Sequence, residues 1–443
     1  MSVPAEPMSN LASADESSSA SSEITAGSSA PESTTKAGYR TVDVFYATDR
    51  AADALPLSAY QLSGQKRVLG YLGLAAMMTA LFGGLAMVTK RWITARFSAG
   101  VLACLGAASA GVAIHGDVHI EKHGVGYGAE RGSLVRGRCR VTVPDVHVRG
   151  NIERPSLMKL EWSEDPEKHV VLTEVTELSS DAFDDQLRNA RTSGDRNDVM
   201  VFIHGYNVTF ESAVHRTAQI AVDLPFAGVP ICYSWPSQGT LLGYPVDENN
   251  VAWSVAHLRD FLTDLRQQHG DAEIHVVAHS MGNRAMTAAL QQMALQPQTE
   301  NQLKPLASVV LAAPDVDADL FRKDLAPALV QVAGQVTLYA SSDDQALIAS
   351  KQVHGYPRAG ESCPHLVVVP GVETIDVSGI DLSLLGHSYY GDSRWMLRDL
   401  REVIASRLPA SERSALVPRS LASMVYYQLS MSQFDIAERV SGR

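Results

Sequence analysis

Residues 199–341 alternate between short apolar runs and stretches with helical spacing, and this alternation restricts the fold more than any other feature. The runs have the length of strands buried on both faces of a sheet; they are VMVFI (199–203), VPICYSW (229–235), EIHVVAH (273–279), LASVVLAAP (306–314) and QVTLYAS (335–341). Helices are expected over about 212–223, 250–269 and 283–295. Strands that alternate with such helices imply right-handed crossovers. The pattern predicts an α/β fold with a doubly wound, mostly parallel sheet.

Polar residues follow directly after most of the predicted strands. They are His204, Gly205 and Tyr206 after the first, Ser280 after the third, Asp315 after the fourth, and Asp343 and Asp344 after the fifth; His387 comes later, in LLGHSYYGD. Ligands of such sheets bind beyond the carboxyl ends of the strands. We therefore expect one site built from these positions.

The stretch HVVAHSMGNR (275–284) has the form of a serine nucleophile on a strand-to-helix turn. The usual pattern is G-x-S-x-G, and Ala278 stands where the first glycine would be. The turn requires little bulk two residues to either side of the serine, and Ala278 and Gly282 are both small. Ser280 is therefore the predicted nucleophile; the alternative is a serine that caps a buried helix.

A nucleophilic serine needs a base, and the base needs a carboxylate that orients it. The order Ser280, Asp344, His387 is the order of such triads on α/β sheets. Asp315 and Asp343 are alternative acids, and the aspartates that are not used are expected to be helix caps or loop residues. His387 is preferred as base over His354 and His365. His204, His275 and His279 lie at strands and are expected to be structural.

An oxyanion hole would use two backbone N–H groups, from Met281 and from Tyr206. Met281 lies where the next helix begins, so the helix dipole favours an anion there. No spacing typical of metal ligands or of a phosphate-binding glycine loop is found, so neither a metal nor a cofactor is expected. The formal net charge of −12, without a basic block, argues against a nucleic-acid partner.

Two uncharged segments interrupt this otherwise polar chain, at residues 68–88 and 97–114. About 20 apolar residues are needed for a helix to cross a bilayer. We therefore expect a two-helix transmembrane hairpin over 66–114, although a buried helical pair is the alternative. Basic residues both between and around the segments leave the orientation open. A hairpin returns the chain to the side that it left, so 41–65 and 115–400 are predicted to form one domain.

The two ends of the chain differ from this domain in composition. Residues 1–40 are rich in Ser, Ala, Glu and Pro, and we expect them to be disordered and not to form a signal peptide. Residues 401–443 show patches of helical spacing and are expected to form a helical tail. The four cysteines are far apart and predict neither a disulfide framework nor a zinc site.

With these elements in place, the sequence resembles the α/β-hydrolase superfamily and, more narrowly, a poorly characterised group of esterase- and lipase-like bacterial serine hydrolases. The resemblance rests on VFYATDR (44–50), YGAERGSLVRGRCRVTVPDVHVRGNIERP (127–155), VFIHGYNVTF (201–210), YSWPSQGTLLGYPVDENN (233–250), HSMGNR (279–284), AAPDVDADLF (312–321), YASSDDQAL (339–347) and GHSYY (386–390). It implies Ser280 as nucleophile, Asp344 as acid and His387 as base. The uncharged pair then looks like an insertion into the domain.

The expected function is that of a membrane-anchored serine hydrolase. It would cleave a carboxylic ester or thioester of a small molecule or lipid, through an acyl-enzyme, at the bacterial inner membrane. An acyltransferase or an amidase would use the same triad, and a membrane scaffold would keep the fold without turnover. The sequence predicts no particular protein partner.

Overall fold

The structure is a computed structural model, and it describes residues 38–57, 122–156, 163–193, 196–296, 304–379 and 393–430, with residues 100, 159 and 161 singly. These residues belong to one unit, Ala37–Arg443. Within the described ranges, no helix has the length and apolarity that crossing a bilayer requires. Apart from Gly100, the predicted hairpin 66–114 lies outside those ranges, as does His387.

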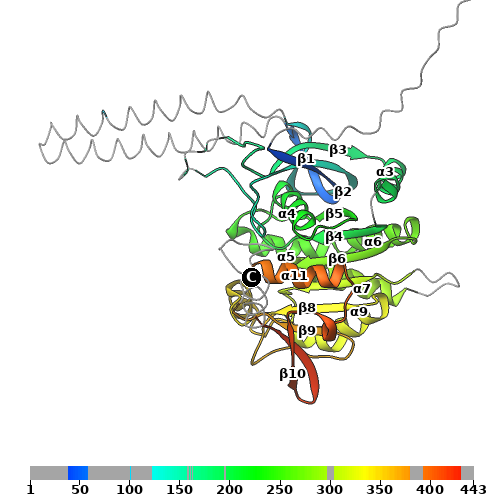
Figure 1. Ribbon diagram of the computed structural model, residues 1–443, viewed down its shortest axis with the longest axis vertical. Coiled ribbons are helices and arrows are strands. Elements are labelled where there is room, and N and C mark those ends of the chain that lie inside the picture. The colour runs from blue at the N-terminus through cyan, green and yellow to red at the C-terminus, as the bar shows by residue number, and fades with distance from the viewer. Residues whose placement is uncertain are drawn as a thin grey trace, which may run out of the picture. The chain divides into compact units, whose positions relative to one another are not determined.

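The described strands form one sheet of eleven strands in the order β10-β11-β9-β8-β7-β6-β4-β5-β1-β2-β3. Figure 1 shows them from β3 at the top to β10 at the bottom. The strands are β1 (Tyr39–Pro56), β2 (His123–Pro144), β3 (Val171–Leu178), β4 (Asp198–Ile203), β5 (Val229–Ser234), β6 (Glu273–His279), β7 (Ser308–Ala312), β8 (Val336–Ala340), β9 (Glu373–Asp376), β10 (Leu416–Leu421) and β11 (Met424–Leu429).

The pairing of these strands confirms a mostly parallel sheet. All neighbours from β1 through β5, β4, β6, β7, β8 and β9 to β11 run parallel. Antiparallel pairs occur only at the two ends of the described sheet, where β2 and β3 extend one side and β10 the other. The central strands β4 to β8 are buried along almost their whole length and are mostly apolar, as expected of strands that are covered on both faces.

Helices cover both faces of the sheet, as a doubly wound fold requires. One core contains side chains of α3 (Ser180–Ser193), α6 (Val255–Gln268), α7 (Gly282–Leu295) and α9 (Ala326–Val332) together with alternate residues of the strands. The residues between these on the strands pack instead with α4 (Phe210–Asp223) and α11 (Ser393–Ile404). Because side chains alternate along a strand, both faces are apolar.

The predicted strands and helices are found, with small changes at their ends. The stretch predicted as one helix over 250–269 is two helices, because α5 (Tyr244–Trp253) ends just before Ser254 and α6 begins just after it. α5 follows a short 3₁₀ helix, η3 (Leu241–Gly243). Beyond β8, α10 (Gln345–His354) packs near α5, and Tyr244 Oη lies 3.3 Å from Ser350 Oγ.

The C-terminal part corrects the helical tail expected over 401–443. Its described residues contain the end of α11 and then the hairpin of β10 and β11, which adds to the sheet beside β9. Ala422 and Ser423 join the two strands with φ of 46° and 68°, as in the tight turns that suit hairpins. The sequence suggests a helix here because its apolar residues do not strictly alternate, whereas the structure places Pro418 in β10, the last strand of the described sheet, where a missing N–H is tolerated.

The first two strands explain how an insertion fits into this domain. β1 and β2 are antiparallel neighbours, and Pro56 at the end of β1 pairs with Val125 near the start of β2. Residues 58–121 therefore leave and return at adjacent positions of the sheet.

Candidate active site

Ser280 lies between β6 and α7 with a φ of 49°, in the left-handed region that residues other than glycine rarely adopt. Such strain persists only where the surrounding structure imposes it, and it is concentrated at functional sites. Its backbone N–H donates to the carbonyl oxygen of Ala312 on β7 (3.0 Å). This is the backbone geometry expected of a nucleophile elbow.

Two glycines permit this turn, and Ala278 is not a position that requires one. A Cβ on Gly282 would lie far inside contact distance of the His204 carbonyl oxygen. A Cβ on Gly205 would lie 3.1 Å from Ser280 Cβ. Ala278, by contrast, is an ordinary buried residue of β6. The backbone therefore approaches closely at Gly205 and Gly282. The replacement of the first glycine of G-x-S-x-G by Ala278 causes no steric conflict.

Asn283 fastens the elbow from the first turn of α7. Its buried amide nitrogen lies within hydrogen-bond distance of three carbonyl oxygens, those of Ala278 (3.2 Å), Ser280 (3.0 Å) and Ala312 (3.2 Å). These carbonyls belong to β6, to the turn and to β7. One side chain thus holds both sides of the predicted nucleophile.

The two predicted oxyanion donors lie on segments that meet at Ser280. Met281 is the N-cap of α7, where backbone N–H groups have no partner within the helix. Tyr206 lies in the turn after β4, next to the glycine that packs on Ser280. Its ring contacts Tyr244 at 5.1 Å between centroids, and its hydroxyl donates to the Leu241 carbonyl. The turn is therefore anchored to the start of α5.

Arg50 on β1 is a buried residue that positions this turn, and sequence reasoning gave it no role. Its guanidinium donates to Ser234 Oγ (2.9 Å) and to the carbonyl oxygens of Gly128 (2.9 Å), Ser237 (3.0 Å) and Val208 (2.8 Å). Burial lowers its pKa to about 10, so it stays charged at neutral pH. The signal that could have found it is an arginine at the end of the apolar strand VFYATDR.

His204 is buried and is bonded on several sides. Its ring stacks on Trp235 with centroids 5.0 Å apart, and the indole N–H donates to the His204 carbonyl oxygen (2.8 Å). Its Nδ1 lies 2.8 Å from the Gly205 carbonyl oxygen. Burial, with the nearby charge of Arg50, lowers the pKa of His204 to about 3, so the ring is neutral beside the site.

The two aspartates after β8 have different partners. Asp344 is the N-cap of α10, and its Oδ1 accepts from the backbone N–H groups of Ala346 (2.9 Å) and Leu347 (3.0 Å). Asp343 is exposed, and its Oδ2 accepts from the backbone N–H of Gly379 (2.6 Å), which follows β9 toward His387. Both carboxylates lie at the carboxyl edge of the sheet.

Asp315, the third candidate acid, is buried in an ion-pair cluster. Its carboxylate accepts from Arg284 (2.8 Å), Arg358 (2.8 Å), Ser350 (2.5 Å) and Tyr244 (3.2 Å). Burial would raise its pKa, but Arg284 and Arg358 outweigh this effect and lower it. The cluster holds α5, α7 and α10 together beside the elbow.

His354 and His275 have structural surroundings. His354 Nε2 lies 2.6 Å from Glu248 Oε1, which ties α10 to α5, and His275 Nδ1 lies 2.8 Å from Ser308 Oγ between two strands. The predicted base His387 lies outside the described residues. The structure therefore brings Ser280, Met281 and the 204–206 turn together at one edge of the sheet.

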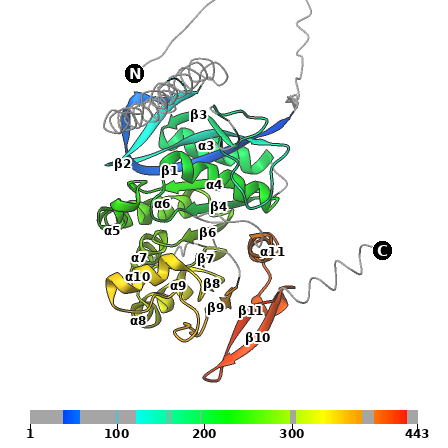
Figure 2. The same ribbon diagram turned by 90° about the vertical axis from the view of Figure 1, so that its left-hand side faces the viewer.

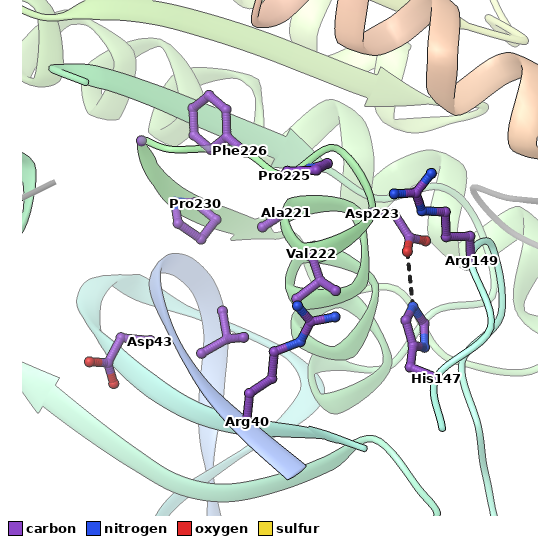
Figure 3. Close-up of a pocket in the computed structure, with 12 residues that line it drawn as sticks. Arg40, Asp43, His147, Arg149, Ala221, Val222, Asp223, Pro225, Phe226 and Pro230 are labelled. Atoms are coloured by element: carbon purple, nitrogen blue, oxygen red, sulfur yellow. Dashed lines mark hydrogen bonds and ion pairs between the residues drawn. The ribbon is translucent and has the colours of Figure 1, made fainter. Parts of the chain in front are cut away.

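A cavity of about 520 Å³ lies at the opposite edge of the sheet, where β1 and β5 begin (Figure 3). His147 is held there between Asp223 (3.0 Å) and Glu153 (2.8 Å). Burial alone would lower the pKa of His147, but these two carboxylates raise it to about 9. This cavity is separate from the predicted active site, because Ser280 follows the opposite end of β6.

One family model agrees with the fold. The model of a family described as "Alpha/beta hydrolase of unknown function" (DUF900) matches residues 179–407, more than half of the chain. An uncharacterized protein of Nostoc sp. strain PCC 7120, alr1448, is 27% identical over 123 residues, which cover 22% of this chain and 32% of that protein. The chain thus spans about a third of that relative. MenH from S. aureus is 12% identical, over 43% of this chain and 89% of MenH, with a TM-score of 0.24.

Proposed function

The chain belongs to the family of α/β hydrolases of unknown function (DUF900), and on that premise we propose that it is a membrane-anchored serine hydrolase that cleaves a carboxylic ester or thioester. The observation that carries this proposal is Ser280 in a left-handed backbone conformation between β6 and α7. An ordinary helix-capping serine needs no such strain, because caps adopt extended backbone angles. The membrane anchor is proposed from the uncharged segments 68–88 and 97–114.

The proposed reaction proceeds in two steps through an acyl-enzyme. Ser280 Oγ attacks the carbonyl carbon while His387 takes the hydroxyl proton, and the resulting oxyanion is bound by the backbone N–H groups of Met281 and Tyr206. Collapse breaks the bond to the leaving alcohol or thiol, which takes the proton from His387. Water, activated by the same histidine, then releases the acid and restores Ser280.

Asp344 is the proposed acid. Two backbone N–H groups donate to its Oδ1 and hold the carboxylate at the start of α10, and Oδ2 is the oxygen proposed to orient His387. Asp343 is the second choice, because it already binds the segment that leads to His387. Asp315 ranks last, since its two oxygens are bound to Arg284 and Arg358.

The test is covalent labelling by a fluorophosphonate probe in membranes that contain the full chain. We expect labelling of the wild type and none of Ser280→Ala. Ser362→Ala is the matched control, because Ser362 is a buried serine whose Oγ has no hydrogen-bond partner among the described residues. Labelling that survives Ser280→Ala contradicts the proposal.

Ester hydrolysis, measured beside the labelling, distinguishes the three candidate acids and shows whether the acyl group goes to water. Hydrolysis of a short p-nitrophenyl ester should fall about 10³–10⁴-fold in Asp344→Asn, and much less in Asp343→Asn or Asp315→Asn. Labelling without hydrolysis would indicate transfer to an acceptor other than water. A full loss in Asp343→Asn alone would move the acid to that residue.

A further inference from the structure

Exposed apolar side chains gather beside the predicted active site. Six of the twelve large apolar residues that are exposed in the described part of the chain come from η3, α5, α8 (Ala318–Leu320), α10 and the segment just after α10. We call these six residues the apolar rim; they are Leu241, Leu242, Val246, Leu320, Val353 and Tyr356. Leu242 is 94% exposed and Leu241 74%, so two adjacent leucines face water. Single exposed leucines are ordinary, but a contiguous patch marks a surface that binds something.

Direct contacts join the elements that carry the rim residues. Glu248 on α5 pairs with His354 at the end of α10 (2.6 Å), so the helices that carry Val246 and Val353 adjoin. The backbone N–H of Ala318 donates to the Pro357 carbonyl oxygen (3.0 Å), which brings the segment of Leu320 next to that of Tyr356. The hydroxyl of Tyr206 donates to the Leu241 carbonyl, so the rim borders the predicted oxyanion turn.

The chain leaves the domain toward the uncharged segments from the same edge of the sheet. β1 runs parallel to β5, and Thr48 pairs with Ser234, the last residue of β5. β1 then continues to Pro56, up to about 25 Å farther at the usual rise of a strand. β2 begins beside that end, because Pro56 pairs with Val125. Residues 58–121 are therefore attached at the carboxyl edge, which is also the edge of Ser280. Figure 2 shows the far part of β1 on the same side as α5, α8 (Ala318–Leu320) and α10.

From this placement we propose that the apolar rim rests on the lipid bilayer, so that the active site faces the membrane and takes ester substrates from it. The inference rests on the proposed function for the substrate, and on the segments 68–88 and 97–114 for the anchor. Apolar side chains that lie in the plane of an interface bury a few ångströms into it and add to binding by their apolar area. The substrate class is then an amphipathic or lipid ester, whose acyl chain passes the rim on its way to Ser280.

The first test measures depth in the membrane and does not depend on catalysis. The full chain, with Cys104 and Cys363 replaced by serine, is reconstituted into vesicles of phosphatidylethanolamine and phosphatidylglycerol; Cys139 and Cys232 are buried and stay. A fluorophore is attached at Leu242→Cys, and at Leu295→Cys as control, because Leu295 is 78% exposed and ends α7 at the opposite edge. Lipids with brominated acyl chains should quench the label at residue 242 about twofold or more, and the label at residue 295 little. Equal or absent quenching at the two positions, or failure of the chain to enter vesicles, overturns the inference.

The second test concerns substrate entry. The double variant Leu242→Asp, Val246→Asp should hydrolyse a long-chain ester held in the bilayer at least about tenfold more slowly, with unchanged hydrolysis of a soluble short-chain ester. Leu295→Asp is the control and should change neither. Equal loss on both substrates, or loss on neither, contradicts a role in entry. If the fluorophosphonate labels Ser280 but residue 242 is not quenched, the hydrolase proposal stands and the membrane-facing rim fails. If the label at residue 242 is quenched and Ser280 is not labelled by the fluorophosphonate, the membrane-facing rim stands and the hydrolase proposal fails.

Discussion

Ser280 owes its position to the residues around it more than to its own side chain. Asn283 bonds to the carbonyl oxygens of Ala278, Ser280 and Ala312, and Gly282 leaves room for the backbone of His204. Removal of Asn283 leaves buried carbonyl groups without that donor. The turn would then be free to relax from its strained φ.

We therefore predict that Asn283→Ala lowers the free energy of unfolding by about 2 kcal/mol, and that it reduces fluorophosphonate labelling of Ser280 more than this loss of stability explains. Urea unfolding and the labelling rate at a temperature where both proteins are folded would check this. Thr287→Ala, one turn later on α7 with its hydroxyl bonded to the Asn283 carbonyl (2.7 Å), is the control and should leave labelling nearly intact. Full labelling of Asn283→Ala would show that the nucleophile elbow does not need the hydrogen bonds of the Asn283 side chain.

Buried neutral histidines make the fold sensitive to acid. Burial lowers the pKa of His204 and His215 to about 3 and that of His275 to about 4. The folded pKa lies below the unfolded value of about 6.5, so the unfolded chain binds more protons below that pH. Stability is thus complete above about pH 6.5 and is lost as the pH falls toward the folded values.

Each of these histidines should lower the free energy of unfolding by about 1–2 kcal/mol at pH 5 relative to pH 7.5. The measurement is urea unfolding at both values for wild type and His275→Asn, which removes the titration and keeps a polar group near Ser308. The variant should lose less stability than the wild type over this interval. An identical loss in both proteins would show that His275 is not held neutral.

Much of this site could be predicted from individual residues, and some of it could not. Ser280 stands out because a small-x-Ser-x-Gly turn between an apolar strand and a helix has a specific steric purpose. Arg50 was missed as a positioning residue because its partners are mostly backbone carbonyls of segments more than 70 residues away in sequence. The choice among Asp315, Asp343 and Asp344 also depends on partners that are distant in sequence. The spacing of residues along the chain does not reveal these partners.

Between elements, buried polar contacts hold α11 to the sheet. Asp399 on α11 accepts from the Tyr339 hydroxyl on β8 (2.5 Å) and from Arg413 (3.2 Å), and both guanidinium and carboxylate are fully buried. Arg413 also pairs with Glu373 at the start of β9. A buried pair of this kind is costly to break, because the remaining charge loses its partner.

Asp399→Ala should therefore destabilise the protein by about 3–5 kcal/mol, whereas Asp319→Ala, at an exposed pair with Arg322, should cost about 0–1 kcal/mol. Thermal or urea unfolding of the two variants provides the comparison. A loss below about 1 kcal/mol in Asp399→Ala would mean that α11 is held by its apolar face alone.

The elements that were predicted well are those with one clear period. The buried strands β4 to β8 and the helices α4 and α7 match their expected ranges closely, because a continuous apolar run or a helical stripe has few alternatives. The break at Ser254 between α5 and α6 is not visible in the sequence, since apolar residues on both sides of it recur at helical spacing. The hairpin of β10 and β11 was missed because its partner is β9, more than 40 residues earlier.

For the chain as a whole, the insertion should be separable from the domain. Because Pro56 pairs with Val125, a short Gly/Ser turn in place of residues 58–121 would close β1 and β2 into a hairpin. We predict that this variant moves from the membrane fraction to the soluble fraction, unfolds cooperatively and still reacts with the fluorophosphonate at Ser280. Fractionation in carbonate buffer, far-ultraviolet circular dichroism and labelling would check these three outcomes. Wild type in the soluble fraction would contradict the anchor, and a variant that does not fold would contradict separability.

The position of residues 58–121 between β1 and β2 also determines the order in which these parts of the chain are synthesised. β1 pairs with β2 and β5, and both partners are made after residues 58–121. At about 5–20 residues per second, β1 waits several seconds for β2, whereas a hairpin closes in about 1–10 μs once both strands exist. If residues 68–114 insert into the bilayer as proposed, they can do so during that wait, before the sheet has begun to form around β1. The domain would then assemble on a chain that is already tethered, with its carboxyl edge nearest to the lipid from the start.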